Sequence, residues 1–346
     1  MTDVSQILQR FLPADAGMRD TAIAFAPANI ALCKYWGKRN EPLKLPLTGS
    51  LSVSLGQHGT RMHLSRAESD SLTINENPFA PHDKASRRLF DFLDLLRPKN
   101  TPLRVDSINT IPMAAGVASS AAAFAAVVLA MDQLCGWQLD PQHLSILARI
   151  GSGSAARSVS HGFMEWQAGI NADGMDSYAV HVAPVWPDFR VGIVTVSSSE
   201  KSVGSSEGMR RTRDTATLYR AWPDQVAEDL PAIRQAVLSR DFTQLGERAE
   251  QNAMAMHATM LAARPPILYW HPNTVATLNR VWACRQQGLE VYATMDAGPN
   301  VKLLFLQKDT PGIQEAFPTV DIVNPSEMPG DGGRDNGNSQ TSSSIT

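Results

Sequence analysis

The sequence is poor in cysteine, and it lacks both an excess of positive charge and a long uninterrupted apolar run. Its three cysteines, Cys33, Cys135 and Cys284, lie far apart and form neither a metal-ligand spacing nor a disulfide framework. The net charge of −3 provides no basic field for nucleic acid or for an anionic membrane surface. We therefore expect a cytoplasmic protein that binds neither nucleic acid nor membrane.

No secretory signal is visible in residues 1–20, which carry several charges and no continuous apolar run. Val4, Ile7, Leu8 and Phe11 would line one side of a short helix there, which fits a docking or fraying extension better than a targeting signal. The one stretch that resembles a membrane span, 113–131, is dominated by alanine and interrupted by glycine and serine. We interpret it as a buried helix of a soluble protein.

The length of 346 residues and a hydrophobic content of 43% are enough for two globular domains. Apolar periodicity predicts strands at 50–55, 103–109, 189–197, 290–295 and 301–306. It predicts helices at 86–96, 141–148, 205–220, 223–239, 241–262 and 273–287. Asp140 is placed to cap the second of these helices. The last residues, 325–346, have too few apolar groups to offset ordering entropy and are predicted to be a disordered tail.

The segment 112–123 combines a turn-forming start, a loop of small residues and a run of alanines that favours a helix. Such a loop lets backbone N–H groups approach a ligand, and the helix directs its positive dipole end toward an anion such as phosphate. Ser119 and Ser120 add hydroxyls that would serve as N-caps or as phosphate or metal ligands. A capped, alanine-rich core helix explains this segment equally well, and neither a P-loop nor a Rossmann fingerprint is present.

Two further segments concentrate polar and cationic groups. In 26–38, Lys34 and Lys38 flank aromatic residues and would clamp a phosphate, although a strand end with solvated lysines is the simpler interpretation. In 151–158, the hydroxyls of Ser152 and Ser154 precede Arg157, and arginine is suited to bidentate recognition of carboxylate or phosphate. Taken alone, this second segment is more typical of a surface turn than of a site.

Asp296 stands where an apolar strand meets the turn 296–300. A carboxylate at such a junction is well placed for a cleft, but aspartate is also a common turn former. His161 and His257 belong to no metal-binding spacing, so we interpret them as satisfied or exposed histidines.

The sequence resembles the diphosphomevalonate decarboxylase family, within the GHMP kinase superfamily. Four segments carry the resemblance in matching order and spacing: APANIALCKYWGK at 26–38, PMAAGVASSAAAF at 112–124, GSGSAARSVSHGFMEW at 151–166 and DAGPN at 296–300. The similarity extends over residues 22–310.

The resemblance implies an α+β, two-domain GHMP kinase-like fold with the active-site cleft between the domains. Its N-terminal domain would be ribosomal-protein-S5-domain-2-like, and its C-terminal domain a ferredoxin-like α/β sandwich. We expect an N-terminal extension at 1–20, the ATP-binding domain at 21–190, the second domain at 191–324 and the tail at 325–346. The family also implies a homodimer.

The activity implied is the ATP-dependent decarboxylation of (R)-5-diphosphomevalonate to isopentenyl diphosphate, with Mg²⁺, in the mevalonate route to isoprenoids. ADP, phosphate and CO₂ would be released. Alternatives within the same fold are a phosphomevalonate decarboxylase and a mevalonate 3-kinase that phosphorylates and stops. A non-catalytic nucleotide sensor is a third.

The resemblance also implies roles for individual residues. Asp296 would lie near the substrate's 3-hydroxyl, while Arg157 and Asn29 would hold its carboxylate. The substrate's phosphates would be held by Tyr35, Lys38, Ser152, Gly153 and Ser154. The ATP phosphates would be held by Ala115, Gly116, Val117, Ala118, Ser119 and Ser120, with Ser120 also contacting Mg²⁺. Lys201 and Ser205 would lie near the phosphate being transferred.

Three positions depart from the family pattern. Thr48-Gly49-Ser50 replaces the usual Asn-Ser-Ser, His161 replaces a glycine, and Ser206 stands where some members have an arginine that contacts the diphosphate. These departures leave open how many phosphates the substrate carries, but they do not affect Asn29, Arg157 or Asp296.

Overall fold

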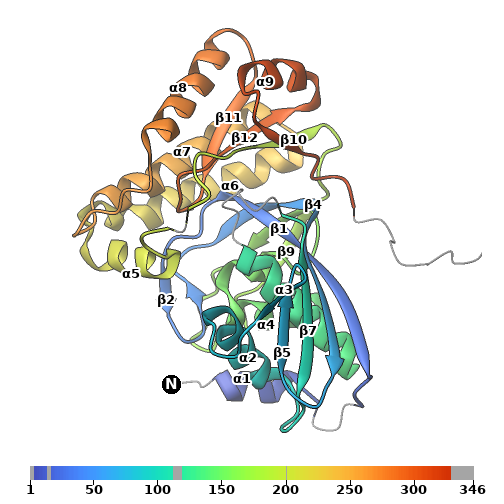
Figure 1. The fold of residues 1–346 in the computed structure, drawn as a ribbon. Coiled ribbons are helices and arrows are strands. Elements are labelled where there is room, and N and C mark those ends of the chain that lie inside the picture. The colour runs from blue at the N-terminus through green and yellow to red at the C-terminus, as the bar shows by residue number, and fades with distance from the viewer. Residues whose placement is uncertain (1–3, 14–16, 112–118, 200, 329–346) are drawn as a thin grey trace, which may run out of the picture.

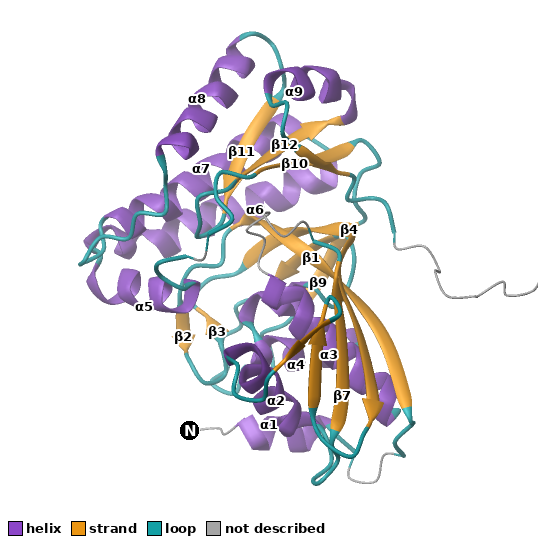
Figure 2. Cartoon of the chain, in the orientation of Figure 1, coloured by secondary structure: helices purple, strands orange, loops and turns teal. Residues whose placement is uncertain are grey.

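The computed structural model describes residues 4–13, 17–111, 119–199 and 201–328 (Figure 1). Within these residues the chain forms two sheets, each with its own helices, stacked one above the other (Figure 2). The fold is thus α+β with two domains, as predicted. None of the helices in the described part is both long and apolar enough to cross a membrane.

The first sheet has seven strands in the order β6-β5-β7-β4-β8-β9, with β1 paired to β4. Its strands are β1 (Thr21–Cys33), β4 (Ser50–Arg66), β5 (Ser71–Ile74), β6 (Asn77–Phe79), β7 (Leu103–Asn109), β8 (Phe163–Trp166) and β9 (Ala179–Ala183). A separate hairpin joins β2 (Lys38–Asn40) to β3 (Leu45–Pro46). The long strand β4 pairs with β1, β7 and β8, so it organises the sheet.

Helices cover one face of this sheet and form the first core with it. They are α1 (Val4–Phe11), α2 (Lys84–Leu96), α3 (Ser119–Cys135) and α4 (Pro141–Gly151), which a 3₁₀ turn at Gly153–Arg157 follows. Ile7 and Leu8 of α1 are buried in this core, which fits a docking extension. Asp140 caps α4 by accepting a hydrogen bond from the backbone N–H of His143, as predicted.

The second sheet has four antiparallel strands in the order β11-β12-β10-β13. They are β10 (Phe189–Val194), β11 (Val291–Met295), β12 (Val301–Leu306) and β13 (Asp321–Val323). The helices of this domain are α5 (Ser205–Thr215), α6 (Trp222–Ser239), α7 (Phe242–Leu261), α8 (Pro272–Gln286) and α9 (Thr310–Ala316). Short 3₁₀ turns occupy Thr217–Ala221 and Gln307–Asp309. This strand order, with helices between β10 and β11 and between β12 and β13, is the expected ferredoxin-like arrangement.

Helices α6 and α7 join the two domains (Figure 1). Both contact β1 of the first sheet, and α7 also packs on β11 of the second. The core cluster here therefore contains residues of both domains, among them Val53 of β4, Trp222 of α6 and Tyr292 of β11. The two domains therefore pack against each other through one continuous core.

Several elements were not anticipated from the sequence, among them β5, β6, β8, β9, β13 and α9. The change from one sheet to the other falls between the end of β9 at Ala183 and the start of β10 at Phe189. A domain division at 190/191 remains a prediction. Of the predicted tail, 325–328 are described, and Glu327 accepts hydrogen bonds there from Gln57 and Asn324. Residues 329–346 lie outside the described chain.

Gly246 provides a test of how α7 packs on β11. A Cβ at this position would collide with the ring of Tyr292, which is fixed between Phe242 and Arg285. We expect Gly246→Ala to destabilise the protein by about 1–3 kcal/mol through overpacking. This outcome opposes the gain of about 1 kcal/mol that alanine normally brings to a helix.

Urea unfolding measures the effect, with Gly17→Ala as the control because Gly17 is exposed, lies in no helix or strand, and has no described atom within 4 Å of a Cβ built there. The control should change stability by less than about 0.5 kcal/mol. A Gly246→Ala protein at least as stable as the wild type would contradict this account of the packing.

Candidate functional site

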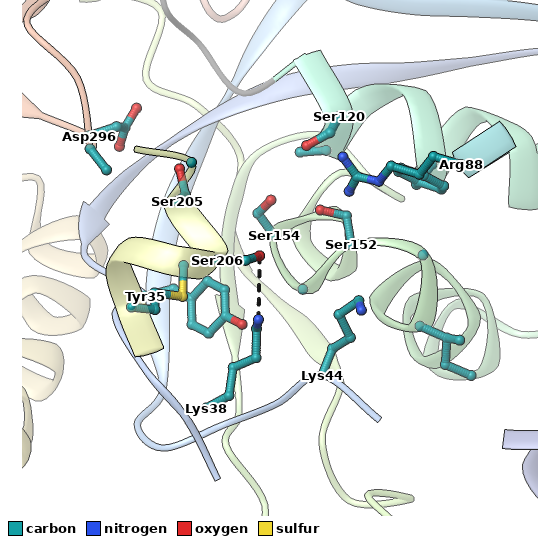
Figure 3. A pocket seen from close by; sticks show the side chains of 18 of the residues that line it. Tyr35, Lys38, Lys44, Arg88, Ser120, Ser152, Ser154, Ser205, Ser206 and Asp296 are labelled. Carbon is teal, nitrogen blue, oxygen red and sulfur yellow. Dashed lines mark hydrogen bonds between the residues drawn. The ribbon is translucent and has the colours of Figure 1, made fainter. Parts of the chain in front are cut away.

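A pocket of about 1080 Å³ opens between the two domains (Figure 3). The first domain supplies the end of β1, the β2–β3 hairpin, one side of α2, the start of α3 and the 3₁₀ turn after α4. The second domain supplies the start of α5 and the turn after β11, which carries Asp296. The segments singled out in the sequence therefore meet in one place.

Most of the candidate site residues line this pocket. They are Asn29, Tyr35, Lys38, Ser120, Ser152, Gly153, Ser154, Arg157, Ser205 and Asp296. Lys201 lies beside the pocket turn, since a Cβ at Gly298 would be 3.3 Å from Lys201 Cε. Ala115, Gly116, Val117 and Ala118 lie outside the described residues. Ser119 begins α3, but its side chain is likewise outside the description.

Asp296 sits between two buried lysines. Its Oδ1 is 3.1 Å from Lys34 Nζ, and its Oδ2 is 3.5 Å from Lys302 Nζ. Lys34 follows β1 in the first domain, whereas Lys302 lies in β12 of the second. The Asp296 side chain keeps 26% of its surface exposed toward the pocket, while each lysine keeps only 2%.

These contacts determine the charge of Asp296. Burial would raise the pKa of its carboxyl, but the charges of Lys34 and Lys302 outweigh burial and hold that pKa well below its ordinary value. Burial lowers the pKa of Lys34, and the attraction of Asp296 opposes that change. The pKa of Lys201 is also lowered by burial, again against the attraction of Asp296. At neutral pH the site therefore holds an ionised carboxylate between two buried lysines.

Lys302 was missed at the level of sequence. The signal available was a lysine within the apolar strand VKLLFL, where a charged side chain needs a buried partner. That partner is Asp296, at the start of the turn that leads into β12. The antiparallel pairing of β11 with β12 brings the two side chains together.

Arg157 is buried, with 2% of its surface exposed, yet it has no carboxylate within ion-pair distance among the residues that the structure describes. Its guanidinium donates hydrogen bonds to Ser50 Oγ and to Asn29 Oδ1, the latter at 3.4 Å, while its Nε has no partner. Burial lowers the pKa of Arg157 to about 10, so it remains charged at neutral pH. Asn29 is held in turn by donating to Ser158 Oγ at 2.7 Å. The arrangement presents to the pocket a buried cation that the charge of Asp296 stabilises without a direct ion pair.

Tyr35 and Lys38 occupy another part of the pocket wall. The Tyr35 hydroxyl is buried without a hydrogen-bond partner, and Gly153 permits its close approach, since a Cβ at Gly153 would be 2.7 Å from that oxygen. Lys38 Nζ donates to Glu41 Oε2 at 2.8 Å and to Ser206 Oγ at 3.5 Å (Figure 3). Ser152 and Ser154 extend into the same region (Figure 3). Several donors thus converge where an anion would find them.

His257 lies behind the Asp296 turn. Its Nε2 is 3.1 Å from the backbone oxygen of Asp296, and burial lowers its pKa to about 4. A neutral imidazole that donates to this oxygen is a satisfied core histidine, as predicted.

Comparison with known protein families identifies the family of this chain. Residues 26–179 match the model of the diphosphomevalonate decarboxylase-like N-terminal domain, and residues 191–328 match that of the mevalonate 5-diphosphate decarboxylase C-terminal domain. The chain belongs to the diphosphomevalonate decarboxylase family. The resemblance carried by the four sequence segments is thereby confirmed.

Individual relatives agree with the assignment to the diphosphomevalonate decarboxylase family. The diphosphomevalonate decarboxylase of Aspergillus fumigatus is 39% identical over 84% of this chain and 78% of its own length. The crystal structure of the Staphylococcus aureus mevalonate diphosphate decarboxylase superposes with a TM-score of 0.82 at 35% identity, over 88% of this chain and 95% of that one. A structure described as MDDEF in complex with MVAPP, AMPPCP and magnesium has a TM-score of 0.80 at 34% identity, over 88% of this chain and 96% of that one.

The buried cluster around Asp296 makes a stability prediction that needs no knowledge of turnover. Asp296→Asn leaves Lys34 and Lys302 without their counter-charge and should cost about 1–3 kcal/mol, below the 3–5 kcal/mol of a fully buried pair, because Asp296 faces the pocket. Adding Lys302→Met should recover part of this loss, with a coupling energy of about 0.5–3 kcal/mol.

The stabilisation that Asp296 provides should also decrease at acidic pH. Since the pKa of Asp296 is lower in the folded protein than in the unfolded chain, the stabilisation is fully present above about pH 4 and is lost as the pH falls through the folded-state pKa. Urea unfolding of the four proteins of the cycle at pH 7 measures the coupling. Strictly additive losses would contradict the proposed electrostatic link.

Proposed function

We propose that this protein catalyses the ATP-dependent decarboxylation of (R)-5-diphosphomevalonate to isopentenyl diphosphate, releasing ADP, phosphate and CO₂. One observation carries the proposal. Arg157, a buried guanidinium that forms no ion pair with a carboxylate of the described residues, lines the same pocket as Asp296, a carboxylate held ionised by two lysines. The names of the relatives and the ligands of the neighbouring structure support the same chemistry.

Asp296 would accept a hydrogen bond from the substrate's 3-hydroxyl and direct that oxygen at the γ-phosphorus of ATP. A carboxylate with a lowered pKa is a weak base, so the proton would transfer only as the new P–O bond forms. Phosphoryl transfer passes through a loose transition state that depends mainly on positioning and charge. Lys34 and Lys302 keep Asp296 ionised and fixed for that role.

The second step breaks the bond between C1 and C2 of the 3-phosphorylated intermediate. Its electron pair forms the double bond between C2 and C3, while phosphate leaves C3 and C1 departs as CO₂. Arg157 and Asn29 would hold the C1 carboxylate so that this bond is aligned with the departing phosphate. Because Arg157 already donates to Ser50 and Asn29, it can orient the carboxylate without neutralising it fully.

The nucleotide would bind at the start of α3. Ser119 and Ser120, with the backbone of 115–118, would take the ATP phosphates, helped by the positive end of the helix dipole. Lys201 and Ser205 would approach the phosphate being transferred. Among the described residues, no group of three or more His, Cys, Asp or Glu side chains forms a metal cage.

The described residues still fit Mg²⁺, because this ion usually binds through the phosphates of a nucleotide and needs few ligands from the protein itself. Ser120, whose hydroxyl lines the pocket, is the residue that would contact it. When bound, the ion would neutralise charge on the transferring phosphate.

The substrate's phosphates would be bound at the other part of the pocket, by Tyr35, Lys38, Ser152, Gly153 and Ser154. Among the described residues the Tyr35 hydroxyl has no partner, and the Lys38 ammonium is paired with Glu41, an exposed carboxylate; a phosphate ester would accept hydrogen bonds from both. We further propose a cytoplasmic homodimer, for which light scattering at micromolar concentration is the direct test.

A coupled assay tests the proposed function. The wild-type protein with ATP, Mg²⁺ and 5-diphosphomevalonate should release ADP and CO₂ in equal amounts, and 5-phosphomevalonate should be a poorer substrate. ADP without CO₂ would identify a 3-kinase instead, and ATP binding without any turnover would identify a sensor.

Substitution of the two principal residues should separate their roles from stability. We expect Asp296→Asn and Arg157→Gln each to lower kcat at least about 100-fold, the usual effect of removing one transition-state contact. Arg149 is the matched control for Arg157, because it is equally buried but donates to the backbone oxygens of Leu43 and Gly174.

Arg149→Gln should therefore lower the melting temperature more than it lowers the kcat of the folded enzyme. Near-normal turnover by Asp296→Asn would refute the mechanism. An Arg157→Gln enzyme that keeps kcat but melts early would reduce Arg157 to a structural role.

The pH profile provides a further test. Lys34 has a lowered pKa, so it should lose its proton at a lower pH than an ordinary lysine, and kcat/KM should fall on the alkaline side. Lys302 is one of the charges that lowers the pKa of Lys34. Lys302→Met should therefore raise that pKa and move the alkaline limb to higher pH. Measurement of kcat/KM from pH 6 to 10 decides, and a limb that moves downward would contradict the assignment.

A further inference from the structure

Lys44 lies in the turn of the β2–β3 hairpin in an unusual backbone conformation. Its φ of +53° is in the left-handed region, which glycine or asparagine occupies at lower steric cost than lysine. Backbone strain of this kind is found disproportionately where a side chain has a task.

The hairpin fixes the point from which this side chain leaves. Leu43 and Leu45, on either side of Lys44, are buried, and the Leu43 N–H donates to Asn40 Oδ1 at 2.9 Å. Arg149 Nε donates to the Leu43 oxygen at 3.2 Å and ties the turn to α4. The backbone of Lys44 is thereby anchored at the pocket wall, and Figure 3 shows its ammonium directed toward Ser152.

This ammonium has cations around it and no anion of its own. Within the described chain no hydrogen bond or ion pair reaches Lys44 Nζ, and the carboxylate that acts on it, Glu41, already pairs with Lys38 at 2.8 Å and Arg213 at 3.7 Å. Arg88 enters the pocket from α2 with its guanidinium over the Phe124 ring at 4.7 Å (Figure 3). Burial, Lys38 and Arg88 all lower the pKa of Lys44. Such a cluster of like charges favours an anionic ligand.

Two phosphate-bearing ligands would enter this pocket, and position separates them. The nucleotide would lie at the start of α3, whereas Lys44 comes from the same hairpin as Lys38 and lies near Ser152, across the pocket from Asp296 (Figure 3). A substrate whose 3-hydroxyl is at Asp296 would extend its phosphorylated end toward Lys38. The phosphate farther from the carbon chain would then be the group that meets Lys44.

We propose that Lys44 binds the terminal phosphate of the substrate's diphosphate and thereby sets the preference for the diphosphorylated over the monophosphorylated substrate. This inference rests on the function proposed above. A monophosphate held by Lys38 and the serines would not extend as far as Lys44, so its binding does not depend on this residue.

Lys44→Met removes the charge and keeps the length of the side chain. We expect a rise in KM for 5-diphosphomevalonate of about 10-fold or more, the usual effect of losing one charge-assisted hydrogen bond, with kcat and the KM for ATP changed less than about twofold. The KM for 5-phosphomevalonate should not change. Lys44→Arg should retain most of the affinity because it keeps a cation.

Two further proteins separate binding from folding. Lys44→Asn suits the left-handed backbone better than lysine, so the same loss of affinity in this variant cannot come from a disturbed hairpin. Arg240→Met is the matched control, because Arg240 is an exposed cation with a φ of +54° at the end of α6, outside the pocket. It should leave all three KM values unchanged.

The outcomes are distinct. Unchanged discrimination between the two substrates in Lys44→Met, or an equal rise in the KM for ATP, would overturn the proposal. Calorimetric binding of inorganic pyrophosphate to the wild type and to Lys44→Met tests the subsite without turnover, and binding should weaken about 10-fold. If the wild type released no CO₂ from 5-diphosphomevalonate, the proposed function would fail, while the pyrophosphate measurement would still decide the role of Lys44.

Discussion

The contact between Lys34 and Asp296 is the interaction on which the site depends, because it joins charges from two domains. Lys34 follows β1 and Asp296 follows β11, and Lys302 from β12 completes the cluster. An ammonium as buried as Lys34 is costly without a counter-charge, so the docked arrangement of the domains is also the arrangement that stabilises this lysine. The backbone N–H of Lys34 extends the link by donating to Asn252 Oδ1, whose amide donates to Asp229. The contacts that join the two domains are therefore also the contacts that determine the charge in the pocket.

The two buried arginines of the first domain show how the fold separates structural from functional charge. Arg149 donates to the backbone oxygens of Leu43, Gly174 and Ser177, so its charge is used within the protein. Among the described residues, Arg157 is as buried but donates to two side chains, Ser50 and Asn29, and it lines the pocket. Each arginine keeps one nitrogen without a partner in the described chain, Nη2 of Arg149 and Nε of Arg157. The difference between them is therefore position: Arg149 holds backbone turns together away from the pocket, whereas Arg157 faces whatever enters it.

Local signals explain which features could be predicted from the sequence. β7 was predicted with its observed bounds because period-two alternation is local, and Asp140 was recognised because an N-cap needs only its own turn. The short elements β13 and α9 were missed because three to seven residues carry too little periodicity. Lys302 and Lys44 were missed for another reason. Asp296 and Lys302 are close in sequence, as are Lys44 and Lys38, but periodicity does not show which way a side chain points after a turn. The pairing of β11 with β12 and the β2–β3 hairpin determine that direction. The resemblance to a family provided the long-range information that local patterns lack.

In the turn 296–300, one residue lines the pocket with a charged side chain and the others hold the turn in place. Asn300 Oδ1 accepts hydrogen bonds from the backbone N–H groups of Val196 and Ser197, which ties the turn to the end of β10. The Pro299 oxygen accepts from Thr274 Oγ1, which ties it to the start of α8. Gly298 leaves room for Lys201, whose Cε would be 3.3 Å from a Cβ there. Asp296 is the charged member of the turn, and its side chain lines the pocket. The other members fix its position and admit a lysine, so a change at Asn300 would act through the position of the carboxylate and not through its charge.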